Sequence, residues 1–231
     1  MIPRTQQTID ELSRHVAADN ELLAGRVGPP SGWTGRGIAD LFAEACGSAS
    51  VSDDYRFGLE YIFEGFLLHY RPPGRLLAPD TPEFNLLAGD YMYAKGLTHM
   101  AALKDAQCIR MLADLISLCA HIDSVTGRAG AAGAAGIRRE TTRAWLLTTL
   151  CLARRAVFGD EDFGEYRRQM DRYRDDIFQN HGGRDAGDVE PVGDSLSSWL
   201  KSGFPQVDLP GWFDELETLC QRDACPGATG A

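Results

Sequence analysis

The chain has 231 residues, of which 44% are hydrophobic and 24% are charged, a composition typical of a globular protein with one sizeable core. Its formal net charge at pH 7 is -10, which argues against a nucleic-acid partner, because neutralising phosphates requires an excess of clustered lysine and arginine. We therefore expect a single domain over 1–231 and no binding of nucleic acid.

Neither a membrane span nor a disulfide framework is indicated. No stretch reaches the roughly 18 apolar residues of a transmembrane helix, and residues 1–16 contain no apolar signal core, so we expect a cytoplasmic protein. The six cysteines form no CxxC pair, and most of them lie in apolar helical segments, which favours reduced core residues. A bond between Cys220 and Cys225 is the alternative.

Apolar residues at helical spacing predict five helices in the first half of the chain. They cover about 6–24, 35–47, 52–70, 85–103 and 105–123. Ser52 and the two aspartates after it form an N-cap cluster, and the proline-rich linker RPPGRLLAPDTPE separates the third helix from the fourth. In the fifth helix the apolar positions cover most of the circumference, which predicts burial on several sides.

The second half is also expected to be helical. The glycine-rich stretch 126–136 is interpreted as a surface loop, or as a flap if a pocket lies nearby. Helices are predicted over 137–159 and 162–179, and two short ones after residue 194. No segment alternates like a strand, so the fold class is all-α: a single-domain bundle of roughly eight or nine helices, with core helices over 35–180 and a tail over 181–231.

Common catalytic motifs are absent from the sequence, but one acidic cluster is a candidate metal site. No GxxxxGK[ST], GxSxG or HExxH motif occurs, and no histidine has a second histidine or a cysteine three or four residues away. Asp171 and Asp175 would share one face of a helix, with Asp176 about 100° round, and could bind magnesium. The arginines interspersed among them favour a solvated helix face instead.

The segment NLLAGDYMYAKGLTHMAALKDAQCIRMLADLISLCAHI, residues 85–122, carries a family resemblance. It resembles the central helices of trans-polyprenyl diphosphate synthases, in which an LAGDYL segment opens a core helix beside the prenyl-chain tunnel. It is more similar still to their small non-catalytic subunit, component 1 of heptaprenyl diphosphate synthase. The resemblance extends weakly over most of the chain and implies a fold of the isoprenoid synthase type.

If the chain is aligned with the active enzymes on this resemblance, it lacks several of their functional residues. Upstream, GWTGRGIADLFAEACG keeps Gly35 and Arg36 of a segment that supplies basic residues for isopentenyl diphosphate. His69 is followed by Tyr70 and Arg71 where active members have their first magnesium-binding aspartate motif. The first aspartate motif is therefore missing.

Two downstream segments also match the family in part. ETTRAWLLTTLCLARRAVFG resembles a helix that opens with lysine and threonine, with Thr141 or Thr142 in place but no lysine before it. YRRQMDRYRDDIFQ resembles the second aspartate motif; it retains Asp175 and Asp176 but has Gln179 in place of the third aspartate.

Prenyl transfer requires the departing pyrophosphate to be neutralised by magnesium ions held between two aspartate motifs. Each 1.36 kcal/mol of lost transition-state stabilisation costs about tenfold in rate. Loss of the first aspartate motif therefore predicts a chain that is inactive alone. The resemblance therefore implies a regulatory small subunit of a heterodimeric polyprenyl diphosphate synthase. It would carry no cofactor, while a catalytic partner subunit holds magnesium.

Such a subunit would shape the tunnel for the prenyl diphosphate product and so set its length; the resemblance points to a quinone side chain. The expected tunnel or interface helix carries Ala88, Gly89, Asp90, Tyr91 and Ala94. The small pair would allow close approach, and Asp90 would cap or anchor the helix start.

Two other functions stay open. One is a degenerate but active magnesium-dependent prenyltransferase or terpene synthase that uses the acids around Asp175. The other is a helical interaction module without any role in isoprenoid synthesis.

Overall fold

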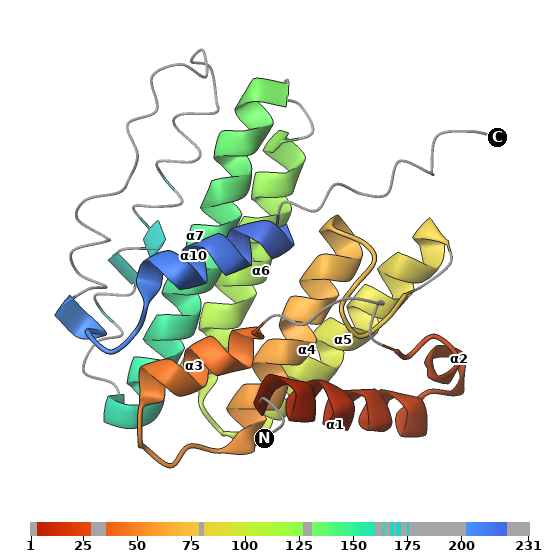
Figure 1. Cartoon of the computed structure of the whole chain (residues 1–231), viewed down its shortest axis with the longest axis horizontal. Coiled ribbons are helices and arrows are strands. Elements are labelled where there is room, and N and C mark those ends of the chain that lie inside the picture. Colours follow the sequence, from red (N-terminus) through yellow and green to blue (C-terminus); the bar gives the residue numbers. More distant parts are fainter. Residues whose placement is uncertain are drawn as a thin grey trace. The chain divides into compact units, whose positions relative to one another are not determined.

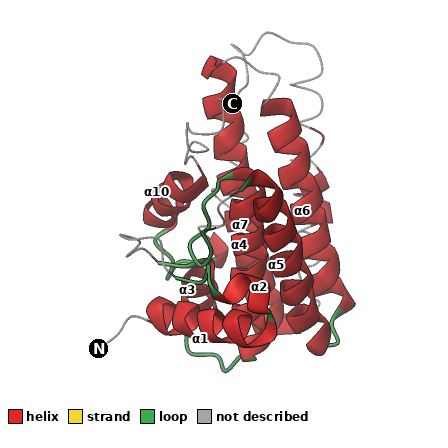
Figure 2. Cartoon of the chain, turned by 90° about the vertical axis from the view of Figure 1, so that its right-hand side faces the viewer, coloured by secondary structure: helices red, strands yellow, loops and turns green. Residues whose placement is uncertain are grey.

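A computed structural model describes the chain at residues 4–28, 36–78, 81–126, 131–159 and 202–220, and at the single positions 164, 167, 168, 170, 171 and 175. These residues form eight α-helices and no strand (Figure 2), apart from an isolated β-bridge between Val27 and Leu77. The predicted all-α class is confirmed. None of the helices in this part of the chain is long and apolar enough to cross a membrane.

Two compact units emerge from the contacts between residues. Unit 1 comprises Met1–Asp40, Ser52–Ile109 and Thr218–Ala231, and unit 2 comprises Leu41–Val51 and Arg110–Glu217. The expectation of a single domain stays a prediction.

Unit 1 is built on four helices: α1 (Arg4–Asp19), α2 (Glu21–Ala24), α4 (Asp53–Tyr70) and α5 (Pro82–Ala102), labelled in Figure 1. The single helix expected over 6–24 is interrupted at Asn20, because its side-chain oxygen accepts hydrogen bonds from the amides of Leu22 and Leu23 and starts a new helix. Ser52 caps α4 as predicted by accepting a hydrogen bond from the amide of Asp54 at 3.2 Å.

The core of unit 1 surrounds α4. Every residue from 58 to 68 is buried, so this helix is enclosed on all sides. Part of the core is a cluster that joins α1, α4, α5 and the segment after α4; it includes Ile9, Leu12, Leu76, Leu77 and Met92. Helix α5 thus belongs to a well-packed unit.

Unit 2 contains α7 (Ala131–Phe158), most of α6 (Ala106–Thr126), most of α10 (Leu209–Cys220) and the end of α3 (Ile38–Cys46). Glu44 of α3 accepts hydrogen bonds from the amide of Asp208 at 3.2 Å and from the indole of Trp212 at 3.0 Å. These two bonds fix the start of α10 against α3.

Two expectations about this region were wrong. The glycine-rich stretch is not a loop after residue 130: α7 already begins at Ala131, because four alanines favour the helix enough to offset two glycines. Helix α6 is buried along one stripe only, whereas all residues from 144 to 153 of α7 are buried. The helix enclosed on all sides in unit 2 is therefore α7.

The cysteines at 46, 108, 119, 151 and 220 are buried, which confirms their interpretation as core residues. Cys225 lies outside the described residues. So does most of the helix expected over 162–179, and α10 is the one described counterpart of the two short C-terminal helices.

Candidate functional site

The candidate site is the pair of helices α4 and α5 with the segment that joins them. The two helices approach closely at two pairs of glycines, Gly58 with Gly96 and Gly65 with Gly89. A Cβ atom on Gly96 would lie 2.8 Å from the carbonyl oxygen of Gly58, and one on Gly65 would lie 3.0 Å from that of Gly89. Glycine is therefore required on both sides of this contact.

The five α5 residues named for the expected tunnel or interface helix differ in their exposure. Ala88 and Gly89 are buried, and a Cβ on Gly89 would meet the ring of His69 at 2.7 Å. Asp90 and Ala94 are exposed, while Tyr91 is half-buried. The small pair thus packs α5 onto α4, and the exposed surface of α5 is formed by other residues.

An exposed apolar pair precedes Asp90 on that surface. Leu86 is 54% exposed and Leu87 is 58% exposed, and the side chain of Asp90 is 74% exposed. Large apolar side chains in such positions mark candidate contact surfaces when they are adjacent. We call Leu86, Leu87, Asp90 and Ala94 the outer face of α5.

A histidine and an aspartate meet at one end of the α4–α5 pair. The Nε2 atom of His69 lies 3.2 Å from an oxygen of Asp90, at ion-pair distance but without the angles of a good hydrogen bond. The ring of His69 also stacks on Tyr93 with centroids 5.1 Å apart. Burial lowers the pKa of His69, and the nearby carboxylate of Asp90 offsets part of that effect.

The reverse arrangement occurs at the other end of the pair. Asp54 of α4 and the Nδ1 atom of His99 of α5 are 2.9 Å apart, and His99 stacks on Tyr61. Each helix therefore gives one histidine and one aspartate to the contact. Together with the glycines between them, these pairs fix the register of the two helices.

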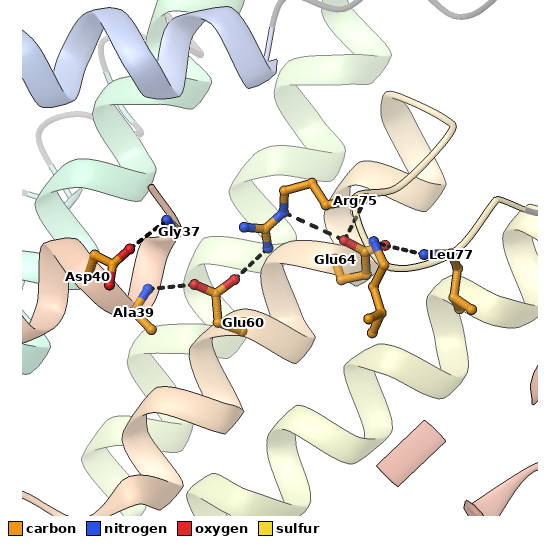
Figure 3. A network of polar contacts seen from close by, with 8 residues as sticks. Gly37, Ala39, Asp40, Glu60, Glu64, Arg75 and Leu77 are labelled. Carbon is orange, nitrogen blue, oxygen red and sulfur yellow. Dashed lines mark hydrogen bonds and ion pairs between the residues drawn. The ribbon is translucent and has the colours of Figure 1, made fainter. Parts of the chain in front are cut away.

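A buried ionic network occupies the interior behind this pair (Figure 3). Glu60 and Glu64 lie one turn apart on α4, and Arg75 belongs to the segment that joins α4 to α5. The guanidinium of Arg75 donates to Glu60 at 2.5 Å, its Nε atom lies 3.6 Å from Glu64, and it also stacks over Phe63. The arginine and both glutamates are essentially unexposed, so the network is shielded from the solvent.

Glu64 organises the segment that follows α4. Its two oxygens accept hydrogen bonds from the backbone amides of Arg75, Leu76 and Leu77, at 2.9, 2.6 and 2.9 Å. A Cβ on Gly74 would lie 2.0 Å from one of these oxygens, which requires glycine there. Burial raises the pKa of Glu64, whereas Arg75 and the amides lower it, and the surrounding donors all fit the ionised form.

Glu60 connects the same network to the start of α3. One of its oxygens accepts a hydrogen bond from the amide of Ala39 at 2.7 Å, at the positive end of that helix. Asp40 accepts from the amide of Gly37 at 3.0 Å, and burial raises the pKa of Asp40. The N-terminus of α3 is thus neutralised by carboxylates of the chain itself (Figure 3).

Arg71, where the resemblance expects the first aspartate motif, is also used internally. Its Nε atom donates to the backbone carbonyl of Cys220 at 2.6 Å, at the C-terminal end of α10. A cis peptide bond follows between Pro72 and Pro73. Arg71 and Arg75 are both buried in the segment after α4.

The second expected site is described only in part. Asp171 is half-buried, Asp175 is exposed, and Asp176 lies outside the described residues. Within the described part of the chain, no three side chains of histidine, cysteine, aspartate or glutamate gather as a metal site would require. The magnesium ligands at 171, 175 and 176 stay a prediction.

The network around Arg75 was not anticipated from sequence. A signal for it exists, because Glu60 and Glu64 interrupt the apolar run LEYIFEGFLL at a spacing of four. Carboxylates on the buried side of a helix need a cation or several amides. The sequence does not say which of the nearby arginines supplies the charge.

Comparisons with protein-family models, with curated protein sequences and with solved structures each returned no match. The expected relationship to prenyl synthases stays a prediction from the sequence.

Proposed function

We propose that this chain is the non-catalytic small subunit of a heterodimeric polyprenyl diphosphate synthase. It shapes the prenyl-chain tunnel and the product length, and a catalytic partner subunit supplies both aspartate motifs and magnesium. The basis is the resemblance of residues 85–122 to the small subunit of such enzymes.

The observation that carries the proposal is the internal use of charge around the end of α4. An active prenyl synthase directs carboxylates toward magnesium and basic side chains toward diphosphate. Here Glu60 and Glu64 are bound to Arg75 and to backbone amides, and Arg71 is bound to a carbonyl. These groups would have to abandon buried partners before they could bind a metal or a diphosphate, which supports a structural role.

The outer face of α5 is the surface we assign to the partner. Leu86 and Leu87 offer apolar area, and Asp90 adds a negative charge. A second copy of the chain would bring Asp90 near its own equivalent if the two faces met around a symmetry axis. The net charge of -10 opposes that arrangement further, so a different protein with a basic residue opposite Asp90 fits better.

The deciding experiment is a prenyl-transfer assay with labelled isopentenyl diphosphate, an allylic primer and magnesium. It compares this chain alone, a synthase with both aspartate motifs from the same genome, and their mixture. We expect a long product of defined length from the mixture only. Activity of this chain alone would refute the proposal and favour a degenerate enzyme.

Two sets of variants locate the contributions within the complex. Asp175→Ala with Asp176→Ala should leave the activity of the mixture largely intact, since the metal belongs to the partner. Gly89→Leu should disturb packing against His69 and so reduce assembly or alter product length. If the mixture with the double aspartate variant assembles but is inactive, the metal site would have to be assigned to this chain.

A further inference from the structure

Three threonine hydroxyls on α7 are buried without a hydrogen-bond partner among the described residues. Thr142, Thr148 and Thr149 each have no exposed surface, and the Oγ1 atom of each lacks a donor or acceptor there. Buried hydroxyls in proteins almost always bond to backbone, to another side chain or to ordered water, because a hydroxyl stripped of water and left unpaired is costly. Three on one helix therefore call for a common explanation.

The usual local solution is not used at these positions. A threonine in a helix can donate to the carbonyl one turn earlier, and Thr98 on α5 does so, with its Oγ1 atom 2.8 Å from the carbonyl of Ala94. The three hydroxyls on α7 make no such bond. Their own helix therefore supplies no partner, and a partner must come from outside it.

The sequence places these hydroxyls in a repeat. ETTRAWLLTTL contains two threonine pairs, Thr141 with Thr142 and Thr148 with Thr149, separated by seven residues. Seven residues advance an α-helix by about 10.5 Å and return it to within about 20° of the same direction. Thr142 and Thr149 thus lie in one row along a helix whose residues from 144 to 153 are all buried.

We propose that this row binds at least two buried water molecules. One water spans about 5.5 Å between two hydrogen-bonded oxygens, so it cannot serve both Thr142 and Thr149. One water lies beside Thr142, and another beside Thr149 is shared with the adjacent Thr148, whose Cα atom is about 3.8 Å away. The threonine row is then an internal hydration site in the apolar interior of unit 2.

The test counts long-lived waters in the full-length protein by oxygen-17 relaxation dispersion. Thr142→Val and Thr149→Val should each remove one such water and lower the Tm by about 2–4 °C, because valine keeps the shape and deletes the water's partner. Thr98→Val is the matched control, since its hydroxyl bonds to its own helix, and it should leave the count unchanged.

Two results would overturn the inference. Valine variants with a higher Tm and an unchanged water count would show that the hydroxyls are dry. A high-resolution crystal structure in which the Oγ1 atoms of Thr142 and Thr149 bond to protein atoms would show that the chain itself satisfies them. That crystal structure needs only the natural sequence, so it decides the question even if the variants fail to fold.

Discussion

Replacing Arg75 by methionine is expected to destabilise unit 1 strongly. The substitution keeps a long side chain over Phe63 but removes the guanidinium of the network, so Glu60 loses its 2.5 Å contact and Glu64 its 3.6 Å neighbour. Glu64 keeps its three amide donors, and Glu60 keeps the amide of Ala39. Removing one partner of a buried ion pair typically costs about 3–5 kcal/mol.

A loss of that size is a large fraction of the roughly 5–15 kcal/mol that stabilises a typical domain. It corresponds to a decrease in Tm of about 6–20 °C at this chain length. Thermal and urea unfolding followed by circular dichroism measure the total. Hydrogen exchange of the α4 peptides assigns the loss to unit 1, since tryptophan fluorescence would report both units: Trp33 belongs to unit 1, and Trp145 and Trp212 belong to unit 2.

The matched control neutralises the partner as well. In Glu60→Gln with Arg75→Met, the amide oxygen of the glutamine can still accept from Ala39, and one buried carboxylate without its cation is removed. The double variant should therefore recover about 1–3 kcal/mol relative to the sum of the two single changes. A cost below about 1 kcal/mol for Arg75→Met, or strict additivity in the double variant, would refute the view that these charges stabilise one another.

Three more changes probe the helix pair. Gly96→Ala places a Cβ 2.8 Å from a carbonyl oxygen of α4 and should cost about 1–3 kcal/mol in urea unfolding, whereas Gly25→Ala, with nothing within 4 Å, should not. His69 has a lowered pKa, so the folded chain binds its proton more weakly than the unfolded chain, and stability should fall as the pH drops below about 6.5. That decrease in stability should be absent in His69→Gln. Identical pH profiles of stability for the variant and the unchanged chain would contradict this role of His69. Leu86→Ser with Leu87→Ser should weaken assembly with the proposed catalytic subunit in sedimentation experiments. The Tm of the isolated chain should stay within a few degrees of that of the unchanged chain. Undiminished assembly would show that the outer face of α5 does not contact the catalytic subunit.

Most of the helices could be predicted because the pattern of apolar residues is local. Ser52 caps α4 as expected, and the predicted starts of α4 and α5 lie within a few residues of the observed ones. The errors have physical causes. Asn20 competes with its own helix through a side-chain cap, and the alanines after residue 130 outweigh the glycines between them.

The candidate site was harder to predict, because its geometry depends on residues that meet only in the folded chain. The LAGDY segment directed attention to α5, but it did not indicate that Gly89 packs against His69 while Asp90 faces outward. Likewise, periodicity marks Glu60 and Glu64 as unusual in an apolar helix without naming Arg75 as their partner. The angles between side chains around one helix follow from sequence, whereas which side faces the core, and which residues it contacts, require the fold.

The network around Arg75 also explains how a helix pair like α4 and α5 can be stable without a bound metal or diphosphate. Buried carboxylates on α4 need compensation, which in a magnesium-dependent enzyme could come from the metal and its substrate. Here Arg75, three amides and the start of α3 provide it within the chain. The glycine contacts and both histidine–aspartate pairs can then form before any ligand arrives. A subunit built in this way would present the outer face of α5 to its partner at all times, so the proposed assembly would depend on apolar contact and the charge of Asp90 rather than on substrate.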